Sequence, residues 1–275
     1  MSFDQLKIYF RNLAKQKGAK TAYEVLKTAA VPPNTDMHLL GHVVGDELYK
    51  QEGLNGIKIC TQDFRNACSH SIVVGLFTDK GEQALPQISQ VCHQAPGGSG
   101  AYTMCFHGLG HGILAFADYD LEKAIKICQQ TGQTEAAQCI SGTIMEIISG
   151  GDHDKTLWSK MRQKYLFVNN PFYPCSADFM PEIGKQLCFN YLTPYLWEAV
   201  GANINNPTES DFSKSFALCR QISEKNPEYQ DSCYGGFGKE FTSLSQNKDI
   251  RRIDQMSNQQ FLQVYKWCEL AQDIK

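Results

Sequence analysis

The sequence predicts an all-α protein built from stacked helical hairpins, each closed by a disulfide. Three observations lead to this fold class. Ten of the eleven cysteines fall into successive pairs, helix-like segments flank these pairs, and polar, turn-rich loops separate the paired cysteines. The second cysteines stand at positions 68, 105, 139, 188 and 233, at intervals of 37, 34, 49 and 45 residues. A recurrence of this length is typical of curved α/α solenoids.

The cysteine pairs give the expected disulfides. They are Cys60 with Cys68, Cys92 with Cys105, Cys128 with Cys139, Cys175 with Cys188, and Cys219 with Cys233. We expect each first cysteine to close a helix, each second cysteine to open the next, and each bond to stabilise the fold by roughly 2–4 kcal/mol. A reduced chain with buried thiols is the alternative. A thiolate metal cluster is disfavoured, because Cys-x-x-Cys never occurs.

Composition limits the compartment and the partners. The net charge is −3, so no basic surplus points to nucleic acid, and no apolar run approaches the ~18 residues of a transmembrane segment. Residues 1–20 lack the apolar stretch of a signal peptide. Disulfides nevertheless predict a secreted or periplasmic protein whose export signal is not in this chain.

The hairpins divide the chain in order. We expect one domain over residues 1–275, with approximate repeats at 20–53, 54–81, 82–120, 121–151, 156–203 and 210–245 and a partial repeat at 257–275. In the first repeat, a helix over Thr21–Ala30 ends before Pro32, and Asp36 replaces the second cysteine as a helix N-cap. Cys268 resembles the first cysteine of a pair, so we expect its partner beyond Lys275, in a longer protein.

Five histidines occupy matching positions in the first three repeats. Counted from Asp36, Cys68 or Cys105, three lie two residues on and two lie six residues on; they are His38, His70, His107, His42 and His111. The spacing i, i+4 within two of the repeats puts both imidazoles on one helix face. Such pairs can bind one divalent metal ion. Glycines between them, as at Gly41 and Gly108, let another backbone, a metal ion or a ligand approach closely.

These five histidines are the predicted metal ligands. Helices packed ~8–10 Å apart put the first and third histidine helices ~16–20 Å apart in a straight stack, so one shared ion requires tight curvature. The alternative is that His70 divides between two sites. Histidine with carboxylate suits zinc, iron, manganese or copper, and we favour zinc or iron, with copper as an alternative. Without metal, the histidines are hydrogen-bonded to their neighbours or act as acid and base.

Two families share parts of this pattern. Cys60-x7-Cys68 and the following Ser-His-Ser-Ile-Val-Val-Gly resemble the cysteine-stapled Sel1-like repeats of secreted bacterial proteins, which implies paired helices with one disulfide per repeat. The later cysteine loops are longer than in that family. Cys105-Phe-His-Gly-Leu-Gly-His-Gly is similar to helix starts in lanthionine-cyclase toroids. That likeness implies a closed α/α toroid as an alternative architecture and transfers no ligand.

The sequence supports three functions. The first is a metal-dependent hydrolase or oxidoreductase, with Glu146 as the catalytic proton-transfer residue. The second is a non-catalytic module that binds a small molecule, peptide or glycan on the concave face of a solenoid. The third is a metal carrier or sensor. The later repeats lack the histidines, so we expect them to serve as scaffold.

Overall fold

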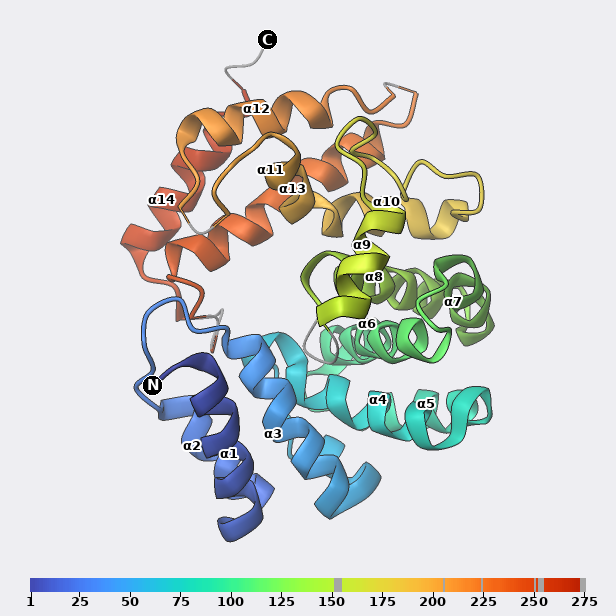
Figure 1. Cartoon of the computed structure of the whole chain (residues 1–275), viewed down its shortest axis with the longest axis vertical. Helices are drawn as coiled ribbons and strands as arrows, with labels where there is room; N and C mark the ends of the chain where they lie inside the picture. Colours follow the sequence, from blue (N-terminus) through green and yellow to red (C-terminus); the bar gives the residue numbers. More distant parts are fainter. Residues whose placement is uncertain (151–154, 205, 224, 250, 252–254, 273–275) are drawn as a thin grey trace. The chain divides into compact units, whose positions relative to one another are not determined.

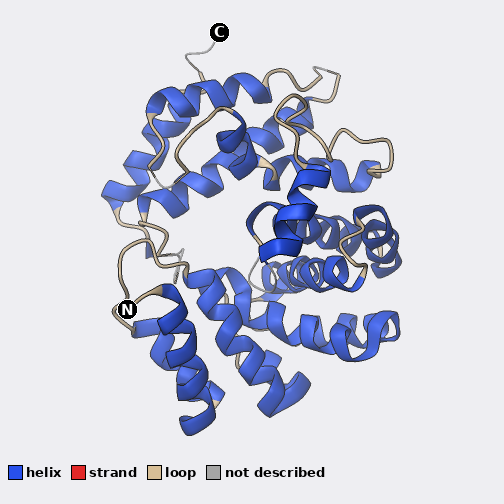
Figure 2. Ribbon diagram, in the orientation of Figure 1, coloured by secondary structure: helices blue, strands red, loops and turns tan. Residues whose placement is uncertain are grey.

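The computed structural model describes residues 1–150, 155–204, 206–223, 225–249, 251 and 255–272. All regular elements in these ranges are helices, and no strand occurs among them (Figure 2). The predicted all-α class is therefore confirmed, while the solenoid and the toroid both stay predictions. No described helix is long and apolar enough to cross a membrane.

The described residues form two compact units. The first comprises residues 1–142 and 246–256, and the second comprises residues 143–245 and 257–275. The first contains α1 (Phe3–Lys17), α2 (Ala19–Thr28), α3 (Met37–Glu52), α4 (Ala67–Lys80), α5 (Leu85–Cys92), α6 (Gly98–Phe116), α7 (Leu121–Cys128) and the start of α8 (Gln133–Ser149). Short 3₁₀ helices join some of these: η1 (Gly53–Lys58), η2 (Asp63–Asn66), η3 (Gly81–Ala84) and η4 (Gln129–Thr131).

The second unit is organised around one long helix. It contains α9 (Lys155–Tyr165), α10 (Glu182–Tyr191), α11 (Thr193–Ala199), α12 (Glu209–Cys219), α13 (Pro227–Ser245) and α14 (Asn258–Glu269), and all but α9 of these pack on or next to α13. Its core is aromatic. Trp197 lies 5.8 Å from both Phe212 and Phe237, measured between ring centres, and Phe241 lies 4.6 Å from Phe212. The aromatic segment before residue 198 thus contributes to core packing, as core-facing aromatics usually do.

All five predicted disulfides are present. They join the cysteine pairs named above, and Cys268 is free and exposed. Disulfides are characteristic of oxidising compartments, so their number indicates a protein that folds outside the reducing cytosol.

The expected cysteine positions within the helices were partly wrong. Cys92, Cys128 and Cys219 end helices as predicted, whereas Cys60 and Cys175 lie in loops. Of the second cysteines, Cys68 alone lies at a helix start, whereas the others stand about two turns inside their helices. These helices begin earlier than expected: α6 starts within the glycine-rich loop, and α13 starts at Pro227, since proline is favourable in a first helical turn.

The first unit brings the histidine helices into direct contact. Helix α4 packs against α3 and also against α6, and Figure 1 shows it between them. Glycine makes the second contact close, because a Cβ on Gly108 of α6 would lie 2.6 Å from the Cα of His70 on α4. Likewise, a Cβ on Gly142 of α8 would lie 1.9 Å from the carbonyl oxygen of His107. The glycines beside the histidines therefore serve the close approach of backbones.

Candidate metal centre

Helix α3 places the first two histidines on one face. Asp36 caps the helix as predicted, because its carboxylate accepts the backbone N–H of Leu39 at 3.0 Å. From this fixed start, His38 and His42 lie one turn apart, and their ring centres are 4.7 Å apart. His38 is buried and His42 is half-buried.

The ring of His70 lies at the middle of the histidine cluster, which we define as His38, His42, His70, His107 and His111. Its centre is 5.6 Å from those of His38, His42 and His107, and 5.8 Å from that of His111. The histidine pairs of α3 and α6 also lie close to each other, since the ring centres of His42 and His111 are 6.1 Å apart. The structure thus brings all five predicted residues together, with the rings of α3 and α6 reaching toward each other around His70.

A backbone carbonyl sets the tautomer of His38. Its Nδ1 lies 2.6 Å from the carbonyl oxygen of Phe64, and a carbonyl can only accept, so Nδ1 carries the hydrogen. Nε2 of the neutral ring then carries the lone pair that a metal ion would bind. This arrangement is typical of metal-binding histidines, whose other nitrogen is held by an oxygen acceptor.

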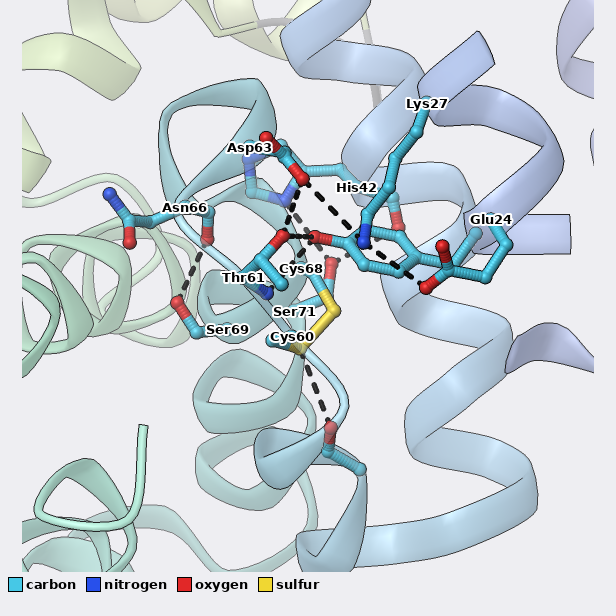
Figure 3. Close-up of a disulfide and its surroundings, with 12 residues drawn as sticks. Glu24, Lys27, His42, Cys60, Thr61, Asp63, Asn66, Cys68, Ser69 and Ser71 are labelled. Carbon is cyan, nitrogen blue, oxygen red and sulfur yellow. Dashed lines mark hydrogen bonds and ion pairs between the residues drawn. A yellow bond between two sulfur atoms is a disulfide. The ribbon is translucent and has the colours of Figure 1, made fainter. Parts of the chain in front are cut away.

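The loop that supplies this carbonyl is tightly held. Phe64, Arg65 and Asn66 all have positive φ, an unfavourable conformation for residues other than glycine, and the Cys60–Cys68 disulfide closes the loop around them. Upstream, the hydroxyl of Thr61 donates to Asp63 at 2.6 Å, and Asp63 also pairs with Lys27 at 3.6 Å (Figure 3). The strained turn therefore presents its carbonyl to His38 in a fixed position.

A serine sets the tautomer of His42 in a similar way. The hydroxyl of Ser71 donates to the carbonyl oxygen of His42 at 3.1 Å, so its oxygen accepts the Nδ1–H of the His42 ring at 3.2 Å (Figure 3). The Nε2 atoms of His38 and His42 are then both lone-pair atoms, and they lie 3.2 Å apart. Facing lone pairs at this distance suit a shared metal ion, whereas the other tautomer of His42 would donate its Nε2–H to Nε2 of His38 as an ordinary hydrogen bond.

Burial disfavours the protonated forms of His38 and His70. It lowers the pKa of His38 from 6.5 to about 4, since the charged ring would lose its hydration, and nearby Asp36 offsets only part of this effect. Burial also lowers the pKa of His70 well below 6.5, and the surrounding histidines lower it further. His38 and His70 are therefore neutral imidazoles at neutral pH, which is the protonation state that binds metal ions.

His70 is a buried side chain with unmet hydrogen-bonding capacity. It has no exposed surface, and neither Nδ1 nor Nε2 has a hydrogen-bond partner. Leaving a buried polar atom unsatisfied costs about 1–3 kcal/mol, so native proteins rarely do it without a functional reason. A metal ion coordinated by the ring would supply the missing interaction.

Three histidines have the spacing of a metal site. One nitrogen each from His38, His42 and His70 lies within 4.8 Å of the other two. Bonds of about 2.0–2.1 Å in a tetrahedral site put two ligand nitrogens about 3.3 Å apart, close to the Nε2 separation of His38 and His42. The group consists of imidazoles alone, among the residues that the structure describes. These residues could hold zinc, copper or iron.

The second predicted pair lies on α6 beside this group. His107 is fully buried, and its Nδ1 lies 2.7 Å from the hydroxyl oxygen of Ser141, which itself donates to the carbonyl of Gln138. Nδ1–H of His107 therefore donates to Ser141, so its Nε2 carries the lone pair. His111 is half-buried, with its ring centre 5.2 Å from that of His107.

Acidic residues on α3 have other roles, and the role predicted for Glu146 on α8 stays untested. Asp36 caps α3, and buried Glu47 pairs with Lys50 at 2.8 Å. Glu146 lies on the part of α8 that belongs to the second unit, where its carbonyl accepts the indole N–H of Trp158 at 3.2 Å. Its catalytic role stays a prediction. His93 lies outside the cluster and is exposed, stacked on Tyr102.

The sequence interpretation missed the groups that orient the histidines. These are the carbonyl of Phe64 and the hydroxyls of Ser71 and Ser141. One signal was available, because Ser141 stands two residues after Cys139, where the earlier repeats have histidine.

No protein-family model, curated protein or solved structure matches this chain.

Proposed function

We propose that this chain is an exported metal-binding protein in which His38, His42 and His70 hold a transition metal ion. The observation that carries the proposal is His70, a fully buried imidazole with neither nitrogen hydrogen-bonded. It lies beside two histidines whose Nε2 atoms are 3.2 Å apart. Five disulfides support a secreted or periplasmic location, where thiols oxidise.

A catalytic role is favoured by the partial exposure of His42. Structural metal sites are closed, whereas catalytic zinc sites combine three protein ligands with one position for water or substrate. A bound ion would supply Lewis acidity for hydrolysis, or redox chemistry if it is iron or copper. The chain itself would fix His38 through Phe64 and His42 through Ser71, and it would keep water away from buried His70.

The test is metal analysis of protein purified without a histidine tag. After dialysis against zinc and removal of free ion, mass spectrometry should find at least one zinc per wild-type chain. The zinc affinity of His70→Asn should be at least tenfold lower than that of wild type. His93→Asn, which removes an exposed histidine, should bind like wild type. Because His70 is buried, its substitution can disturb folding. His42→Ala removes a half-buried ligand and is therefore a second variant, and circular dichroism checks that both proteins fold.

A metal-free wild-type protein, or His70→Asn and His42→Ala proteins that bind zinc like wild type, would contradict the proposal. Metal-free protein that binds a peptide or glycan would favour the non-catalytic module. A coordination sphere with no open position would favour a carrier or sensor.

A further inference from the structure

We propose that the histidine cluster holds two metal ions, with His70 as a ligand to both. His38 and His42 would complete the first site, and His107 and His111 the second. This inference rests on the proposed function, because it presupposes the first site. It assigns a role to the α6 histidines, which the three-histidine site leaves unused.

The layout of the cluster separates the ligands into two sets. Helix α3 supplies one His-x-x-x-His pair, α6 supplies the other, and α4 packs against both helices with His70. Four ligands complete a tetrahedral site, so one such ion does not use five imidazoles. Two ions that share His70 use all five and leave coordination positions for water or substrate.

The ring separations match on the two sides. Within the pairs, ring centres lie 4.7 Å apart on α3 and 5.2 Å apart on α6. From His70, the distances are 5.6 and 5.6 Å to the α3 pair, and 5.6 and 5.8 Å to the α6 pair. Two imidazoles on one tetrahedral ion have centres about 5 Å apart, given bonds of about 2.0–2.1 Å.

His70 itself gives the strongest argument. A single ion would coordinate one of its nitrogens and leave the other, an N–H, buried without an acceptor. Binding a second ion satisfies that nitrogen as well. The ring then loses its N–H proton to solvent, and the resulting imidazolate donates one lone pair to each ion.

The second site also has its own orienting group. Ser141 fixes the tautomer of His107 as Ser71 fixes that of His42. The nitrogens of His38, His42 and His70 already lie within 4.8 Å of one another, so we expect the first site to fill first.

Copper titration with electron paramagnetic resonance (EPR) tests the shared ligand. Wild-type protein should bind two Cu(II) ions. Its EPR signal should rise over the first equivalent and fall over the second, because a bridging imidazolate couples the two spins. His42→Ala and His111→Ala each remove one half-buried ligand from one site, so each protein should bind one fewer tight ion and show an uncoupled signal. His93→Ala is the matched control and should behave as wild type.

The outcomes separate this inference from the proposed function. Two bound ions whose spins stay uncoupled would overturn the shared ligand. One ion in wild type, whether or not it survives in His111→Ala, would overturn the second site and leave the proposed function standing. No bound copper and no bound zinc would overturn both.

Discussion

The two compact units share one kind of close helix contact but place different residues at it. In the first unit, Gly108 and Gly142, each three residues after a disulfide cysteine, pack against His70 and His107 of the preceding helix. In the second unit, Gly236 packs in the same way against Asn190, which stands two residues after Cys188. The histidine position is therefore asparagine in the second unit, where its side chain donates to the carbonyl of Ser232 at 3.2 Å.

This difference shows that close helix packing does not require histidine. The scaffold is kept in both units, while imidazoles occur at the contact only in the first, among the described residues. The contact is thus made with histidine in the first unit and with asparagine in the second, as expected if a functional site was added to a packing scheme that both units share. Matched changes in the two units can test this view.

Alanine at the contact glycines should give the largest effect. A Cβ on Gly142 would lie 1.9 Å from the carbonyl oxygen of His107, and one on Gly236 would lie 2.2 Å from that of Asn190. Overpacking of this kind costs about 1–3 kcal/mol or more, so both variants should unfold at lower denaturant concentration. We expect Gly142→Ala alone to weaken zinc binding, as measured by competition with a chelator. Equal zinc affinity in the two variants would show that the contact between Gly142 and His107 does not help to position the histidine cluster.

Removing one disulfide from each unit compares their roles. Loops of 8 and 13 residues predict a loss of about 2–3 kcal/mol each for Cys60→Ala/Cys68→Ala and for Cys175→Ala/Cys188→Ala. The first double variant should also lose about tenfold or more in zinc affinity, because the freed loop no longer fixes the carbonyl of Phe64. Zinc titration checks this, and the second double variant should retain wild-type affinity.

Acid should destabilise the metal-free first unit. Above pH 6.5 His38 is neutral in both the folded and the unfolded chain. Between pH 6.5 and about 4 the unfolded chain binds a proton that the buried ring excludes, so the free energy of unfolding falls as the pH falls. Chemical denaturation at several pH values measures this slope. His38→Gln should flatten it, whereas His93→Gln should not, and an unchanged slope in His38→Gln would contradict the assignment.

Ser71→Ala should have the smallest effect on stability, about 1 kcal/mol, because it removes one hydroxyl that bonds to His42. Zinc affinity should still fall about tenfold, since groups that orient metal ligands contribute that much. Ser215→Ala in the second unit removes a buried hydroxyl that donates to a helix carbonyl and is the control. A Ser71→Ala protein with wild-type zinc affinity would show that this hydroxyl does not orient His42.

The part of this architecture that follows from spacing along the chain was predictable. Cysteine pairs, the Asp36 cap and the matching histidine positions all depend on residue type and local register. The groups that hold the histidines were not, because they depend on which residues face each other across helices. The carbonyl of Phe64 reaches His38 only through consecutive residues with positive φ. None of these residues is glycine, so the sequence gives no sign of this conformation. Helix starts were missed where proline and glycine lie in first turns rather than in loops.

Anomalous diffraction from crystals of the zinc-loaded protein would show whether His38, His42 and His70 bind the ion. We expect a zinc peak within about 2.0–2.1 Å of one nitrogen each from His38, His42 and His70, with Nδ1 of His38 still donating to Phe64. A peak elsewhere, or zinc-soaked crystals in which the ring of His70 contacts no ion, would contradict this expectation.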